Sequence, residues 1–115
     1  MANDSEHQRN AKLFQLIKQG KQDSFKELFS CYYSPLCNFA FLFVSDSQIV
    51  EEIVSDVFIN IWQKKERIDI KVDLKAYLYK STKNTIISYS RKHQLDVVNI
   101  EDYKDYNWYY HLQYH

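Results

Sequence analysis

The chain has 115 residues with a single glycine and a single proline, and 17% of its residues are aromatic. This length leaves room for one domain, and the scarcity of turn-forming residues excludes a compact multi-stranded sheet and a glycine-rich nucleotide loop. Acidic and basic side chains balance, but residues 71–93 carry a net charge of +5, while residues 46–70 and 94–115 carry −3 each, so local fields rather than total charge decide what this molecule binds.

The first predicted helix covers residues from about 10 to 19. Residues 1–9 are polar, and we expect them to be disordered. Its apolar positions are Ala11, Phe14, Leu16 and Ile17, and Gly20 is expected to end it as a C-cap.

A second helix of about 22 residues follows, with Asp23 or Ser24 as the expected N-cap and Glu27 in place for a capping box. Pro35 stands inside the helix and should kink it, because proline removes one backbone hydrogen bond. Two abutting helices are the alternative. The apolar stripe of this helix consists of Phe25, Leu28, Phe29, Tyr32, Leu36, Phe39, Ala40 and Phe43.

A third helix is predicted after a cap at Asp46 or Ser47. Ile59 stands on its polar side, either as a scattered surface residue, the more frequent case, or as the centre of a docking face surrounded by acids. The buried face comprises Ile49, Val50, Ile53, Val54, Val57, Phe58, Ile61 and Trp62. The opposite face comprises Glu52, Ser55, Asp56, Ile59 and Gln63.

Residues 66–72 favour a loop over a short strand, and Asp73 is expected to cap a fourth helix over about 74–93. An aromatic ring, an amide, a hydroxyl and two cations share about 80° of its outer arc. This set suits nucleic acid, although a solvated face with snorkelling cations fits equally well. The outer residues are Tyr77, Lys80, Asn84, Ser88 and Arg91, and the expected buried ones are Leu74, Leu78, Thr82, Ile86 and Tyr89.

No residues form a convincing catalytic or metal-binding group, so we expect neither an enzyme nor a cofactor. His111 and His115 are spaced for a metal on a helix but have no third ligand. Cys31 and Cys37 point to different faces of a helix, which argues against a disulfide. Free thiols, a polar start without a signal-like segment and short apolar runs indicate a cytoplasmic protein.

Three stretches, in this order and spacing, resemble region 2 of the sigma-70 family, most closely its extracytoplasmic-function (ECF) type in the Bacteroidetes-like group. They read FxxLFxxYYxxLxxFA from Phe25, ExxVxDVFxxxW from Glu51, and YLxxxxxN from Tyr77, before an Arg-Lys pair. The resemblance covers about residues 13–93. It implies an all-α bundle of about four helices with the sigma region 2 fold over residues 10–93.

The resemblance also implies the −10 promoter recognition and melting domain of an alternative sigma factor. The third helix would dock on the β′ clamp helices of core RNA polymerase through Glu52, Asp56, Ile59 and Gln63. The fourth helix and the loop at 66–73 would bind the non-template strand of the −10 element. The DNA-binding residues would be Tyr77, Lys80, Lys83, Asn84, Ser88, Arg91 and Lys92.

Two departures from the family pattern bear on function. Ser88 stands where the family often has Asp, and Tyr77 where Trp is frequent.

Residues 94–115 are acidic and aromatic and lack a clean helical period, and region 4, which reads the −35 element, has no counterpart. We expect a linker or tail there if the chain is cut after region 2. The alternative is a truncated sigma-like interaction module that binds polymerase or an anti-sigma factor without initiating transcription.

Overall fold

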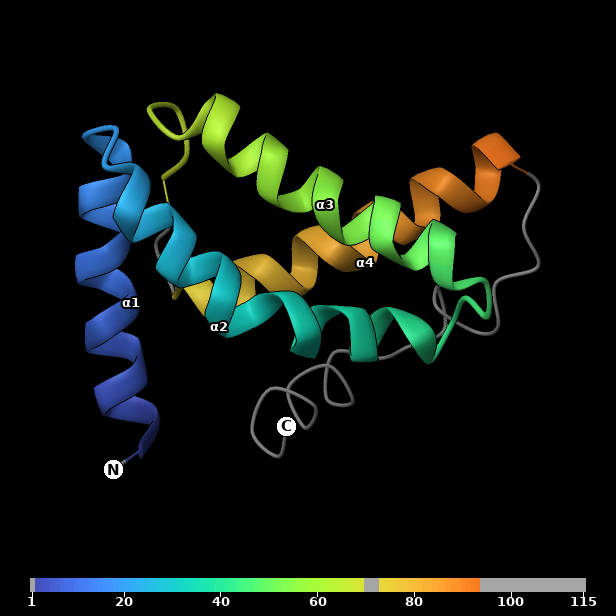
Figure 1. Cartoon of the computed structure of the whole chain (residues 1–115), viewed down its shortest axis with the longest axis horizontal. Coiled ribbons are helices and arrows are strands. Elements are labelled where there is room, and N and C mark those ends of the chain that lie inside the picture. Colours follow the sequence, from blue (N-terminus) through green and yellow to red (C-terminus); the bar gives the residue numbers. More distant parts are fainter. Residues whose placement is uncertain (1, 70–72, 94–115) are drawn as a thin grey trace.

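The computed structural model describes residues 2–69 and 73–93 and consists, within them, of four helices and no strand (Figure 1). The prediction of a small all-α bundle is confirmed. None of the described helices is both long and apolar enough to cross a lipid bilayer. The helices are α1 (Ala2–Lys18), α2 (Gln22–Phe41), α3 (Ser47–Lys64) and α4 (Leu74–His93).

Helices α2 and α4 each pack against all three of the other described helices. Helix α3 runs back along α2, and α4 then runs antiparallel to α3, so that the end of α4 lies near the start of α3 (Figure 1). Helix α1 stands at one end of the molecule and packs against α2 and α4. Helices α3 and α4 are neighbours, and each has one face that is exposed to solvent.

Helix α1 begins much earlier than the sequence indicated, because polar side chains attach its first turns to the bundle. The hydroxyl of Tyr32 donates a hydrogen bond to Glu6 Oε2, and Asn10 Nδ2 donates one of 2.6 Å to the same hydroxyl. Glu6 also forms a 3.4 Å ion pair with Lys75 of α4. Residues 2–9, for which the sequence indicated disorder, are therefore described as part of α1. Hydrophobic periodicity cannot register an attachment made by polar groups.

The end of α1 agrees with the prediction at Gly20, whose φ of +86° is readily adopted only by glycine. Lys21 N donates to Leu16 O at 3.0 Å, and Gly20 N donates to Ile17 O at 2.8 Å. This is the hydrogen-bond pattern of a Schellman motif, which satisfies the last carbonyls of the helix.

Helix α2 starts directly after this turn, so the N-cap is Lys21, which makes no side-chain capping bond, and not Asp23 or Ser24. Asp23 instead stands in the first helical turn, where its negative charge is favourable for the helix dipole. Pro35 lies inside one continuous helix, which excludes two abutting helices; a kink there stays a prediction.

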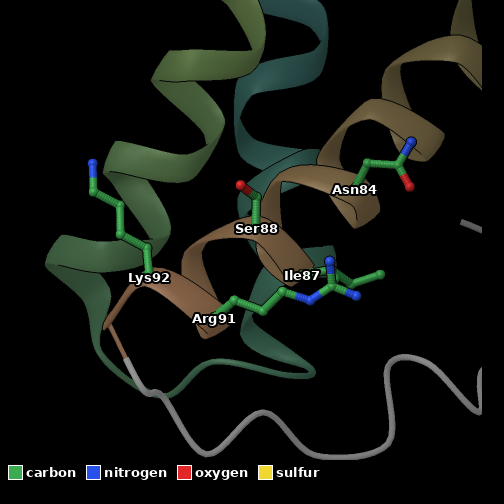
Figure 2. Close-up of a pocket in the computed structure, with 5 residues that line it drawn as sticks. All are labelled: Asn84, Ile87, Ser88, Arg91 and Lys92. Carbon is green, nitrogen blue, oxygen red and sulfur yellow. The ribbon is translucent and has the colours of Figure 1, made fainter.

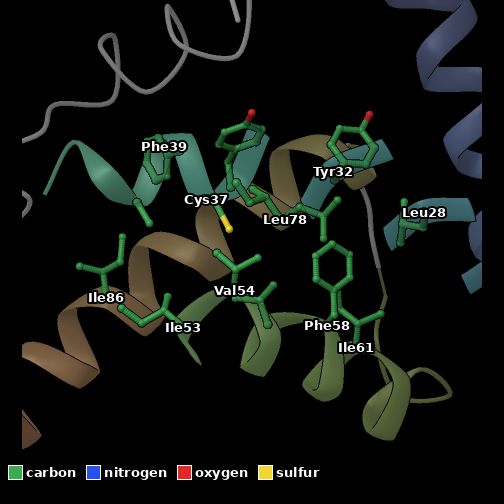
Figure 3. Packing of buried hydrophobic residues seen from close by; sticks show 14 of the residues in the cluster. Leu28, Tyr32, Cys37, Phe39, Ile53, Val54, Phe58, Ile61, Leu78 and Ile86 are labelled. Carbon is green, nitrogen blue, oxygen red and sulfur yellow. The ribbon is translucent and has the colours of Figure 1, made fainter. Parts of the chain in front are cut away.

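The core forms where α2, α3 and α4 face one another, and Figure 3 shows Cys37, Val54 and Leu78 gathered between these helices. Four of the five core positions predicted on α4 are buried; the exception is Tyr89, which is only half-buried. Tyr79 is a further core residue that the sequence did not indicate, being only 1% exposed. Its ring meets the Phe39 ring edge-on, with 5.3 Å between centroids.

Raising the pH above about 10, the pKa of tyrosine in an unfolded chain, is expected to destabilise the fold. Burial raises the pKa of Tyr79 to about 12, and burial together with the Glu6 hydrogen bond raises the pKa of Tyr32. Both groups stay protonated in the folded state while they ionise in the unfolded one. Their contribution to stability is therefore intact below pH 10 and is lost as the pH rises toward 12.

Urea unfolding followed by circular dichroism between pH 8 and 11.5 measures this loss. The Tyr79→Phe variant is the control, because it cannot ionise at this position and should show a smaller loss over the same interval. A midpoint of unfolding that does not change up to pH 11.5 would contradict the prediction.

Candidate functional site

The outward face of α3 brings together the four residues that the sequence predicted for a docking surface. Asp46 fixes the start of the helix, because its Oδ1 accepts from Gln48 N at 2.9 Å and from Ile49 N at 3.3 Å. The exposed fraction of Ile59 is 51%, which is high for a large apolar side chain. We call this set the α3 face; its members, all exposed, are Glu52, Asp56, Ile59 and Gln63.

An apolar groove between α2 and α3 adjoins the α3 face, and Ile59 is part of its lining. Phe29 remains 37% exposed, and its ring lies 4.9 Å from that of Phe58. The Phe25 ring lies 5.1 Å from that of Trp62. The sequence assigned these rings to the core and missed the groove, because the groove depends on how α2 and α3 pack against each other. The lining residues are Phe25, Phe29, Ser55, Phe58, Ile59, Trp62 and Gln63.

Asp56 of the α3 face is bonded to α4, since the hydroxyl of Tyr89 donates to its Oδ2. That hydrogen bond is the largest cause that raises the pKa of Tyr89 to about 12, followed by burial and the charges of Asp56 and Glu52. Tyr89 was predicted as a core residue. In the structure only its ring packs toward the core, while the hydroxyl reaches the surface at Asp56.

The outward face of α4 forms a shallow open groove, which we call the α4 groove (Figure 2). Four of the seven residues predicted to bind DNA line it, together with the half-buried Ile87, which the sequence analysis did not single out. Two cations lie in the last turn of the helix, where the helix dipole favours positive charge. The lining residues are Asn84, Ile87, Ser88, Arg91 and Lys92.

The other three predicted DNA-binding residues lie outside the lining of the α4 groove. Lys80 is exposed, Lys83 is half-buried, and Tyr77 is half-buried with its ring packed against the core. A base that stacks on Tyr77 would therefore meet only the exposed part of its ring.

The segment before α4 contains neither helix nor strand in its described residues, 66–69 and 73, and is held from both sides. Ile68 is buried, and its carbonyl accepts a 2.9 Å hydrogen bond from Lys18 Nζ of α1. Asp73 caps α4 as predicted, because its Oδ1 accepts from Ala76 N at 2.8 Å. The predicted loop is confirmed over these residues, and residues 70–72 lie outside the described part.

In the described ranges 2–69 and 73–93, no three His, Cys, Asp or Glu side chains are grouped so that they could hold a metal ion. The predicted linker or tail at 94–115, which contains His111 and His115, lies outside the described residues.

The family model for Sigma-70 region 2 matches residues 28–95. This span contains most of α2 and all of α3 and α4, and with them the whole α3 face and the whole α4 groove. No curated protein and no solved structure matches the chain. Because the family model covers more than half of the 115 residues, the chain belongs to the Sigma-70 region 2 family.

Proposed function

We propose that this chain is the −10 promoter recognition and melting domain of an alternative sigma factor of the ECF type. The α3 face would bind the β′ clamp helices of core RNA polymerase, and the α4 groove would bind the non-template strand. The observation that carries the proposal is the presence of two different exposed surfaces on neighbouring helices, one acidic and apolar and one basic and polar, within the span that matches the family.

The α3 face has the composition of a protein-docking surface. Ile59 and the adjoining apolar groove offer a hydrophobic centre, and acidic side chains lie beside it. An apolar anchor in such a centre supplies most of the binding energy, whereas surrounding charges speed the encounter with a basic partner. Glu52 and Asp56 would thus select a basic surface on the clamp, and Ile59 would hold it.

The α4 groove has the composition of a single-strand binding site. Arg91 and Lys92 suit phosphate oxygens, and the Asn84 amide can both donate to and accept from a base edge. Removing a base from the duplex costs a few kcal/mol of unstacking, which contacts to the flipped base and the backbone must offset. Ser88 adds a hydroxyl without a negative charge, so phosphate meets no repulsion at that position.

The direct test is binding of the chain to a recombinant fragment that contains the β′ clamp helices, measured by calorimetry. We expect saturable binding that weakens as salt rises, because the α3 face is acidic. A chain that is folded by circular dichroism and yet does not bind the fragment would overturn the polymerase part of the proposal.

Replacing Asn84 by alanine is expected to lower discrimination between bases at one position of the bound strand by about 1–3 kcal/mol, the usual range for a good amide–base contact. The measurement is the affinity of the polymerase-bound chain for a series of single strands that differ at one position each. Asn38→Ala, which removes an exposed amide from α2, is the matched control and should leave discrimination unchanged. Equal discrimination by the wild type and Asn84→Ala would remove Asn84 from the site.

A further inference from the structure

The hydrogen bond from Tyr89 to Asp56 lies at the boundary between the two proposed surfaces. Asp56 belongs to the α3 face, whereas Tyr89 stands next to Ser88 of the α4 groove. The proposed function assigns no role to Tyr89, although its hydroxyl reaches a residue that it assigns to polymerase binding.

The ring of Tyr89 is held in place by its neighbours. One side packs against the hydrophobic core. The ring also stacks on His93, with 5.2 Å between centroids and 28° between planes. A tyrosine has only two side-chain torsions to fix, so a packed ring presents its hydroxyl at a nearly constant position.

Asp56, in contrast, is an exposed side chain on a helix surface, where a carboxylate samples several rotamers. Accepting the Tyr89 hydrogen bond at Oδ2 restricts this freedom, while Oδ1 accepts no hydrogen bond from the described residues. One oxygen is thus fixed and the other is left for a basic side chain of a partner. Ordering a side chain before binding removes part of the entropic cost of association.

We propose that Tyr89 is a positioning residue for polymerase binding, whose hydroxyl holds the Asp56 carboxylate in the orientation that a basic side chain of the clamp recognises. The inference rests on the proposed function and deepens it, because α4 then helps to build the surface displayed on α3. The acidic surroundings keep the hydroxyl in its protonated, donating form, since Asp56 and Glu52 both raise the pKa of Tyr89.

A double-mutant cycle on clamp-fragment binding separates positioning from a merely structural bond between α3 and α4. The variants are Tyr89→Phe, which keeps the ring and removes the hydroxyl, Asp56→Ala, and the combination. Tyr32→Phe is the matched control, because it removes a tyrosine–carboxylate hydrogen bond of the same kind at Glu6, away from the α3 face. Thermal unfolding establishes that each variant is folded before binding is measured.

We expect Tyr89→Phe to weaken binding roughly two- to tenfold, the range for ordering one side chain. Added to Asp56→Ala, it should cause no further loss, because it acts only through Asp56. The salt dependence should persist in Tyr89→Phe, which keeps the charge, and diminish in Asp56→Ala. Tyr32→Phe should bind like the wild type.

Three results would overturn the inference while leaving the proposed function in place. Tyr89→Phe could bind the fragment as tightly as the wild type, or it could weaken binding further when combined with Asp56→Ala. The third result is a loss of affinity in Tyr32→Phe equal to that in Tyr89→Phe. Failure of the folded wild-type chain to bind the fragment is a different result, and it would overturn the proposed function and this inference together.

Discussion

Asp56→Arg is expected to weaken binding to the β′ clamp helices by about a hundredfold or more, because like charges placed together at an interface cost several kcal/mol. Asp56 is exposed on α3 and lies one helical turn from Glu52. The substitution removes one of these two acids and places a cation beside the hydrophobic centre formed by Ile59. Calorimetric titration of the clamp fragment with the variant measures the loss.

Glu27→Arg is the matched control for this experiment. Glu27 is an exposed acid on α2, outside the lining of the apolar groove, and its reversal changes the net charge of the chain by the same amount. We expect it to bind almost like the wild type. If both charge reversals weaken binding equally, the clamp fragment responds to the net charge of the whole chain, and the α3 face is not the docking surface.

Phe39→Ala is expected to lower the free energy of unfolding by about 3–5 kcal/mol, the usual loss when a large core side chain is truncated. Phe39 is fully buried, and its ring contacts Phe43 and Tyr79 with centroid distances of 5.4 and 5.3 Å. A domain of this size has a total stability of only about 5–15 kcal/mol. The variant should therefore be marginal at 37 °C, and urea unfolding at low temperature gives its stability.

Phe41→Ala is the internal comparison for the core, since Phe41 lies two residues along α2 and is 45% exposed. Substitutions at such surface positions usually change stability by no more than about 0.5 kcal/mol. Similar losses at the two positions would mean that α2 is rotated relative to the packing described above.

Helices α3 and α4 could be predicted closely from the sequence because each carries a regular apolar stripe and an aspartate cap. Asp46 and Asp73 both cap as expected. The start of helix α1 could not be predicted from the sequence, because its first turns are attached through Glu6 and Asn10, polar residues that carry no hydrophobic period. The start of α2 was misplaced because the helix begins directly after the turn at Gly20, so that Lys21 takes the N-cap position.

For the candidate surfaces, features that lie on one helix could be predicted from the sequence, whereas features built by two helices could not. Residues three or four positions apart share a helix face, so a helical projection places Asp56 with Ile59, and Asn84 with Ser88, without a structure. Features built by two helices were missed, because they depend on how the helices pack. The apolar groove at Phe29 and the hydrogen bond from Tyr89 to Asp56 are both of this kind.

In the proposed function, this chain connects core RNA polymerase to a specific single strand of DNA. Selection from a pool of single-stranded oligonucleotides with a randomised segment, by core polymerase together with the chain, tests both contacts in one measurement. We predict that the wild type enriches one short motif, that Asn84→Ala relaxes one position of it, and that Asp56→Arg enriches nothing beyond polymerase alone. Enrichment by the wild type no greater than that by polymerase alone, or an equal enrichment by Asp56→Arg, would contradict the claim.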